Sequence, residues 1–197
     1  VAWFEAGAAL EDWIAPDHHR NPEGDIVAAG VFSADGADPG SRMLADALPE
    51  RIAGRVADFG AGWGWLAREI LKRDPDELHL VEADARALSC ARKNLSDPRV
   101  RFHWADATGW TAGAPLDAVV MNPPFHAGRE ADPAIGRGFI AAAARLLGGR
   151  GQLWLVANRH LPYEQALKEA FRETGEVTGD TRFKILYAAR PRRPERG

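Results

Sequence analysis

Short apolar runs alternate with segments of helical character from residue 55 onward, and this alternation restricts the fold more than any other feature of the chain. Five runs have the length and composition of strands: residues 56–59, 78–81, 100–104, 116–121 and 153–157. Helical segments separate or follow them, at residues 65–73, 85–95, 133–147 and 163–171. Strands joined through helices run parallel, so we expect an α/β fold with a mostly parallel sheet covered on both faces.

The chain after residue 171 follows a different pattern. Residues 176–178 and 183–189 have strand composition, and Gly179 and Asp180 form a turn signal between them. A connection this short joins antiparallel strands, because a parallel pair needs a long crossover. We therefore expect the sheet to end in an antiparallel hairpin.

Length and composition narrow the class of protein. The 197 residues suit one domain, and 46% apolar with 27% charged residues is typical of a globular chain rather than of disorder or a coiled coil. No apolar run approaches the roughly 20 residues that span a bilayer. The single cysteine excludes an internal disulfide and multi-cysteine zinc sites, and it favours a cytoplasmic location.

The charge is unevenly distributed along the chain. A formal net charge of -3 argues against nucleic-acid binding. Residues 1–120, however, carry a net charge of -8, whereas residues 121–197 carry +5. An anionic partner would therefore be expected to bind the second part.

A glycine-rich turn follows the first predicted strand. It contains Asp58, Gly60, Gly62 and Gly64 at alternate positions and leads into a helix. Glycines let the backbone approach a ligand closely, and ligands of open parallel sheets bind beyond the carboxyl ends of the strands. The dinucleotide fingerprint needs glycine where the chain has Trp65, so pyrophosphate binding is disfavoured. A plain strand-to-helix connector remains the alternative.

Carboxylates follow the next two strands. Glu82 lies 22 residues after Gly60, where an acid can accept hydrogen bonds from ribose hydroxyls, and Asp84 suits a helix cap better. Asp106 ends the third strand, and its residue type fits a ligand contact and a capping role equally well.

The fourth strand runs into Asn122, Pro123, Pro124, Phe125 and His126, the most informative stretch of the chain. Two prolines remove two backbone donors and keep the chain extended, so the carbonyls of Asn122 and Pro123 lack helical partners. Fixed acceptors beside an aromatic ring suit a planar ligand that carries an amino group.

These motifs resemble those of a known family. The glycine-rich turn resembles motif I of class I S-adenosylmethionine-dependent methyltransferases, and Asn-Pro-Pro-Phe resembles the motif of enzymes that methylate planar nitrogens. Further blocks occur in family order at residues 30–33, with Asp38, Gly40 and Ser41, at residues 156–158 followed by 161–163, and at residues 181–184. Over about residues 28–189 the chain resembles the catalytic domain of the ribosomal small-subunit methyltransferase C family and its large-subunit relatives, which methylate guanine N2 in ribosomal RNA. The resemblance favours the small subunit as the source of the RNA.

The resemblance implies a Rossmann-like class I methyltransferase fold: a mostly parallel seven-stranded sheet with a C-terminal antiparallel hairpin and helices on both faces. It implies a methyltransferase domain at residues 28–190, preceded by an extension or domain remnant at residues 1–27 and followed by a basic tail at residues 191–197. Members of the family carry a degenerate domain before the catalytic one, so we expect a preceding domain that is missing from this chain.

The resemblance also assigns roles. The catalytic residues would be Asn122, Pro123, Pro124 and Phe125. S-adenosyl-L-methionine would bind to Asp58, Gly60, Gly62, Gly64, Glu82, Ala83, Asp106, Ala107 and Asn122, without a metal, and leave as S-adenosyl-L-homocysteine. Ribosomal RNA or a ribosomal subunit would contact His126, Arg129, Arg159, Arg182 and Lys184, in the cytoplasm.

Two other functions remain open. The same motif serves methylation of adenine N6 or of a protein glutamine, although such relatives usually have tyrosine where this chain has Phe125. A non-catalytic RNA-binding domain is the second alternative, against which the presence of Asp58, Glu82, Asp106 and Asn122 argues. His126 is either a proton acceptor or a residue with a structural or RNA-contacting role.

Overall fold

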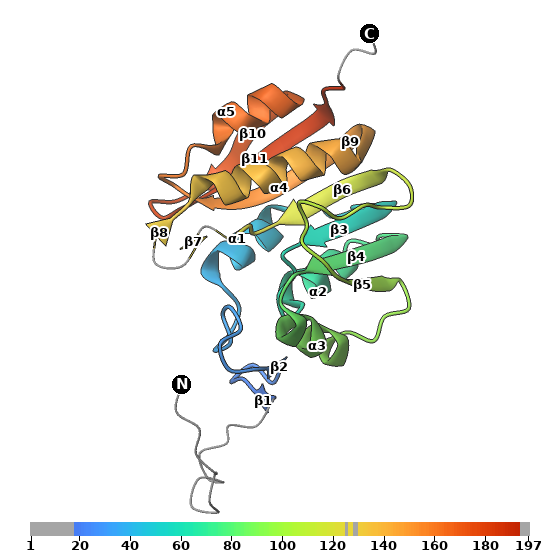
Figure 1. Cartoon of the computed structure of the whole chain (residues 1–197), viewed down its shortest axis with the longest axis vertical. Helices are drawn as coiled ribbons and strands as arrows, with labels where there is room; N and C mark the ends of the chain where they lie inside the picture. The colour runs from blue at the N-terminus through green and yellow to red at the C-terminus, as the bar shows by residue number, and fades with distance from the viewer. Residues whose placement is uncertain (1–17, 125, 128–129, 194–197) are drawn as a thin grey trace, which may run out of the picture.

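A seven-stranded sheet organises the computed structural model, which describes residues 18–124, 126–127 and 130–193 (Figure 1). Its strands are β3 (Arg55–Phe59), β4 (Glu77–Glu82), β5 (Val100–Trp104), β6 (Leu116–Met121), β9 (Leu147–Asn158), β10 (Phe171–Gly179) and β11 (Phe183–Pro191). They lie in the order β10-β11-β9-β6-β3-β4-β5. The predicted fold class is confirmed.

Strand β11 alone among these seven runs opposite to the others. Strand β11 lies between β9 and β10 and pairs antiparallel with both, through partners such as Ile185 with Val156 and Tyr187 with Gly175. The other five strands pair in parallel. Strand β10 was predicted to begin at residue 176. It begins at Phe171, because Phe171 already pairs with Pro191.

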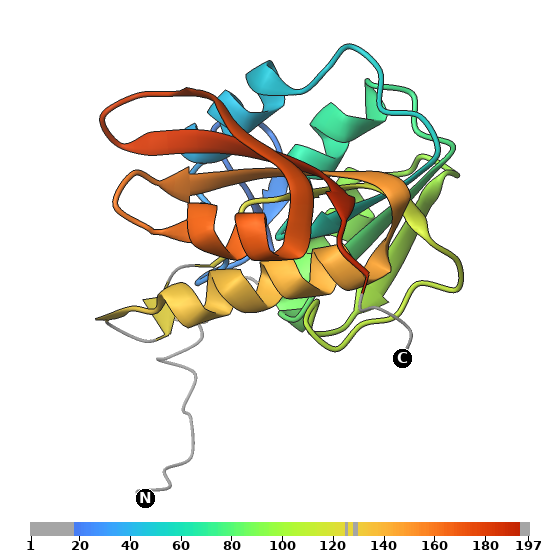
Figure 2. The same ribbon diagram turned by 90° about the horizontal axis from the view of Figure 1, so that it is seen from above.

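Helices cover the sheet on both sides, as Figure 2 shows in a view from above. The helices are α1 (Pro39–Ala47), α2 (Trp65–Leu71), α3 (Ala85–Asn94), α4 (Pro133–Leu146) and α5 (Tyr163–Ala170). Successive side chains of a strand point to opposite faces. Phe59 accordingly packs in the core beneath α4 and α5, whereas Val56 packs in the core beneath α1 and α2. None of these helices, all within the described ranges, is long and apolar enough to cross a membrane.

Aspartates begin three of the helices. Asp38, Asp84 and Asp132 each accept a hydrogen bond from a backbone N–H in the first turn of α1, α3 and α4. The predicted capping role of Asp84 is confirmed. Helix α1 was not predicted, although Asp38 followed by Pro39 is a typical helix start.

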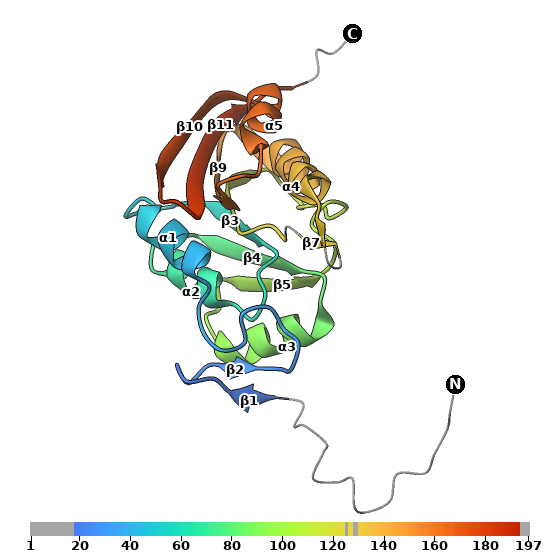
Figure 3. The same ribbon diagram turned by 90° about the vertical axis from the view of Figure 1, so that its left-hand side faces the viewer.

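The chain before α1 packs against helix α3. Strands β1 (His19–Arg20) and β2 (Ile26–Val27) form a small hairpin beside α3, as Figure 3 shows. A second small hairpin, β7 (His126–Ala127) with β8 (Glu130–Ala131), precedes α4. Residues 18–27 therefore pack on the same domain as the residues that follow them.

Candidate active site

The glycine-rich turn after β3 contains two glycines with different surroundings. Gly62 and Gly64 have φ of +56° and +93°, a region that L side chains rarely adopt. A Cβ on Gly64 would lie 2.9 Å from Leu95 Cδ1 and 3.3 Å from Ala91 Cβ, so this glycine lets α2 and α3 approach each other. A Cβ on Gly62 would meet no atom within 4 Å, so Gly62 faces open space.

Glu82 at the end of β4 is tied to this turn. Its Oε2 accepts a hydrogen bond from the backbone N–H of Gly62 at 2.8 Å, and its Oε1 accepts one from that of Asp84 at 2.7 Å. A carboxylate oxygen has two lone pairs, so each oxygen retains capacity for a ligand donor.

Asp58 lies in the core beside the turn and is not exposed to solvent. Its side chain is fully buried, and neither carboxyl oxygen has a hydrogen-bond partner within the described part of the chain. Burial, with the nearby charge of Glu82 as a second cause, raises the pKa of Asp58 to about 8. The proton that this carboxyl retains at neutral pH avoids an isolated charge in the core.

A cavity of about 710 Å³ opens beyond the carboxyl ends of β3, β4, β5 and β6. Its walls contain nine residues predicted for the site: Gly60, Gly62, Glu82, Ala83, Asp106, Ala107, Asn122, Pro123 and Pro124. Asp58 and Gly64, predicted with them, do not line it. The volume lies within the range of small-molecule sites, about 300–1,000 Å³.

Asp106 stabilises a turn and also lies in the wall of the large cavity. Its Oδ1 accepts hydrogen bonds from the backbone N–H and the hydroxyl of Thr108, both at 2.8 Å, so it stabilises the turn after β5. The residue is exposed and lines the large cavity.

Asn122 is held by residues of the chain's first part. Its Nδ2 donates hydrogen bonds to Asp38 Oδ2 at 3.0 Å and to Ser41 Oγ at 2.9 Å. No described residue donates a hydrogen bond to Oδ1 of Asn122. The half-buried amide therefore has a fixed donor end and an available acceptor end.

A second cavity of about 180 Å³ adjoins the first. The two share Phe32, Asn122 and Pro123 in their walls, and Asp38, Asn158 and Arg182 contribute to the second alone. Phe32 is 59% exposed, unusual for a side chain of its size and polarity. Asn122 thus stands where the two cavities meet.

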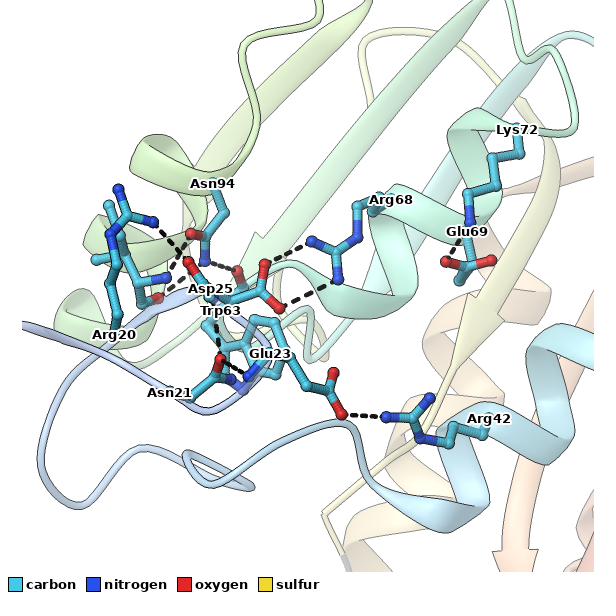
Figure 4. Close-up of polar contacts among 12 residues, drawn as sticks. Arg20, Asn21, Glu23, Asp25, Arg42, Trp63, Arg68, Glu69, Lys72 and Asn94 are labelled. Carbon is cyan, nitrogen blue, oxygen red and sulfur yellow. Dashed lines mark hydrogen bonds and ion pairs between the residues drawn. The ribbon is translucent and has the colours of Figure 1, made fainter.

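The segment before α1 forms one wall of the large cavity through Gly30, Val31 and Phe32. Polar contacts hold this segment, as Figure 4 shows for part of it. Asn94 Oδ1 accepts a hydrogen bond from the backbone N–H of Ile26, and Asn94 Nδ2 donates one to the Ile26 carbonyl, both at 2.8 Å. The indole N–H of Trp63 donates to the Ser33 carbonyl at 3.2 Å. Sequence periodicity gave no sign of this wall, whose residues are far in sequence from their partners.

The predicted RNA-contacting residues are only partly placed at the surface. Lys184 is a correction: its side chain is buried and ion-paired with Glu164 at 2.5 Å, so it is not presented to a partner. Arg159 is bonded to the Glu176 carboxylate at 2.8 Å. Arg182 is exposed and lines the second cavity.

Three other predicted residues are not placed. Phe125 and Arg129 lie outside the described residues, and His126 is described in its backbone alone. Among the side chains that the structure does describe, no group of three or more His, Cys, Asp or Glu residues is arranged to hold a metal ion.

A family model and curated relatives match this chain. The model of the methyltransferase small domain matches residues 26–187. The ribosomal RNA small subunit methyltransferases C of Shewanella amazonensis and Shewanella loihica are 34% and 33% identical to it, each over 92% of this chain. The chain spans about half the length of these relatives, 54% in both cases.

Solved structures share the architecture. The T. thermophilus 16S rRNA N2 methyltransferase, in complex with AdoMet and guanosine, is 28% identical, with a TM-score of 0.72 over 88% of this chain and 49% of its own. A SAM-dependent O-methyltransferase from Thermotoga maritima has a TM-score of 0.63 over 81% of this chain and 68% of its own. At 16% identity, the second likeness concerns the fold alone.

Proposed function

The chain belongs to the methyltransferase small domain family, and from this membership we propose that it methylates the exocyclic N2 amine of a guanine in small-subunit ribosomal RNA, with S-adenosylmethionine as the donor. The names of the Shewanella relatives and the guanosine bound to the T. thermophilus enzyme support this substrate. The observation that carries the proposal is the position of Asn122, which lines both cavities and has an available acceptor oxygen.

The large cavity fits S-adenosylmethionine in volume and in chemistry. Glu82 retains acceptor capacity for ribose hydroxyls, and the open space at Gly62 leaves room for a ligand against the backbone. Asp106 and Ala107 would hold the adenine end, while Gly60 and Gly62 would lie along the rest of the molecule. When bound, the cofactor supplies an electrophilic methyl group on a positively charged sulfur, and its transfer to N2 leaves a neutral thioether and releases one proton.

Asn122 would act on the substrate amine. The N2 lone pair is delocalised into the guanine ring, which makes the amine a poor nucleophile. Acceptance of its N–H groups by Asn122 Oδ1 and the Pro123 carbonyl favours a pyramidal nitrogen with its lone pair directed at the methyl group. Placed dipoles of this kind stabilise the transition state more than the ground state.

The target base would enter from the second cavity. A guanine inside a helix cannot reach Asn122, so the base must be unpaired or flipped out. Phe32 offers an aromatic wall there, and Phe125 would stack on the base. Arg182 at this cavity would contact the RNA backbone, together with Arg129 and His126. With ribosomal RNA as its substrate, the enzyme would act in the cytoplasm.

Two measurements test the function. Titration calorimetry should detect S-adenosylmethionine binding to the purified chain, and its absence would contradict any methyltransferase function. Radiolabelled transfer to ribosomal particles from a strain that lacks the gene should yield N2-methylguanosine on mass mapping. Formation of N6-methyladenosine would contradict the proposed substrate. Asn122→Ala should abolish transfer and keep cofactor affinity within about tenfold, because the loss is mainly one of transition-state stabilisation.

A further inference from the structure

We propose that Asp38 is a positioning residue that holds the Asn122 amide in the orientation that methyl transfer requires. Asp38 lies in the segment of residues 30–41. The proposed reaction uses Phe32 of this segment as a wall for the base, but it assigns no part to Asp38. The inference rests on the proposed role of Asn122, so its test needs one readout that is independent of the reaction.

The contacts of Asp38 connect a helix start with the reacting amide. Its Oδ2 accepts hydrogen bonds from the backbone N–H of Ser41 at 2.8 Å and from Nδ2 of Asn122 at 3.0 Å. Ser41 Oγ accepts the other bond from Nδ2, at 2.9 Å. Two acceptors thus match the two hydrogens of the amide nitrogen.

These acceptors determine which way the amide faces. Rotation of Asn122 by half a turn about χ2 would place Oδ1 against the carboxylate oxygen of Asp38, and two acceptors repel each other. The observed orientation leaves Oδ1 as the end available to a substrate amine. A charged acceptor also polarises the amide, which makes Oδ1 a stronger acceptor.

The elements that carry the acceptors are rigidly placed. Ser41 is 8% exposed, and a Cβ on Gly40 would lie 3.2 Å from the Phe183 ring, so the first turn of α1 packs tightly against β11. The two acceptors, Asp38 Oδ2 and Ser41 Oγ, therefore stay in place if the Asn122 amide rotates, and the rotation would break both hydrogen bonds. A constellation held in this way keeps the reacting geometry without reorganisation.

The test separates capping from positioning. Asp38→Ser keeps a good helix cap but is too short to reach Asn122, whereas Asp38→Asn both caps and reaches. We expect kcat to fall by about 10- to 100-fold in Asp38→Ser, with the KM for RNA and the affinity for S-adenosylmethionine within about threefold, and Asp38→Asn to recover most of the loss. Asp132→Ser, which changes the equivalent cap of α4, is the matched control and should leave kcat unchanged.

A spectroscopic measurement on the protein alone completes the test. The chain has four asparagines, so the side-chain amide signals of Asn122 can be assigned by comparison with Asn122→Asp. These signals should shift and exchange faster with water in Asp38→Ser, but not in Asp132→Ser.

The outcomes separate the two proposals. An inactive wild-type chain would contradict the proposed function, and the amide signals would then decide on the contact made by Asp38. In an active chain, kcat of Asp38→Ser within about threefold of the wild type would overturn the inference, as would an equal loss in Asp38→Asn. Unmoved Asn122 signals would overturn it in either case.

Discussion

Arg68 on α2 donates two hydrogen bonds to the carboxylate of Asp25, at 2.5 and 3.2 Å (Figure 4). The Asp25 side chain is 8% exposed and that of Arg68 is 38% exposed, so this ion pair is largely withdrawn from water on the Asp25 side. The pair joins the N-terminal segment to the helix that begins at the glycine-rich turn. The cavity wall at Gly30 and Phe32 therefore depends on a contact outside the cavity.

The first prediction concerns this ion pair. Arg68→Gln should lower the free energy of unfolding by about 2 kcal/mol, because the charge of Asp25 then lacks its partner in a buried position. Arg51→Gln is the control, since its pair with Asp74 spans 3.8 Å with both side chains at least 70% exposed, and it should cost less than about 0.5 kcal/mol. Urea unfolding measures both. Equal losses would show that the Asp25 pair is as weak as a surface pair.

The second prediction contrasts two glycines. Gly64→Ala should destabilise the chain by about 2 kcal/mol or more, because it adds a clash with Leu95 to the strain of a positive φ. Gly62→Ala has the strain without the clash, so it should cost about 1 kcal/mol and lower the affinity for S-adenosylmethionine by at least about tenfold. Thermal unfolding and calorimetry check the pair. A greater loss of affinity in Gly64→Ala would contradict the assignment of Gly62 to the cavity wall.

The third prediction concerns Asp58 and pH. Between its ordinary pKa of 3.8 and the raised value of about 8, this carboxyl keeps its proton in the folded chain and loses it in the unfolded one. The folded state then binds more protons, so the stability falls as pH rises through this range and levels off above it. Asp58→Asn removes this dependence, and its Tm relative to the wild type should rise by at least about 4 °C between about pH 5 and pH 9.

Asp97→Asn is the control for this experiment. Hydrogen bonds from Arg99 lower the pKa of Asp97 to about 2, so Asp97 is ionised in both states above about pH 5. The Tm difference between Asp97→Asn and the wild type should therefore stay constant over the same range. A constant difference for Asp58→Asn as well would show that Asp58 ionises normally in the folded chain.

The fourth prediction separates two basic residues that the sequence placed together. Lys184→Met should change RNA affinity by less than about twofold and should be close to neutral in stability, because Glu164 is 47% exposed and returns to water. Arg182→Ala should lower RNA affinity several-fold, with a weaker dependence on salt, because an exposed cation is lost. Filter binding at two salt concentrations measures both. A large loss in Lys184→Met would show that the ion pair opens when RNA binds.

The sequence predicted the sheet well because its signals are local. Strand and helix periods identified every strand of the seven-stranded sheet, including the hairpin that must be antiparallel. The strand predicted at residues 153–157 corresponds to β9, which begins earlier, at Leu147. The first part of β9 was not predicted because glycines at 148, 149 and 151 interrupt its strand pattern. Helix α1 was not predicted because Gly40 and Ser41 interrupt its apolar pattern.

The site was predictable where topology alone brings residues together. Glu82, Asp106 and Asn122 end parallel strands, and such ends meet at one edge of the sheet. The environment of each side chain was not predictable, because it depends on distant partners: Asp38 lies 84 residues before Asn122. Burial likewise decided the state of Asp58 and of Lys184, and neither is visible in the identity of the residue.

Phe32 and Asn122 belong to the walls of both cavities, and this shared wall has a thermodynamic consequence. Occupants of the two cavities would be neighbours across the same two side chains. Any factor by which one occupant changes the affinity for the other must act equally in reverse. A single coupling free energy would then govern both binding steps, whichever occupant arrives first.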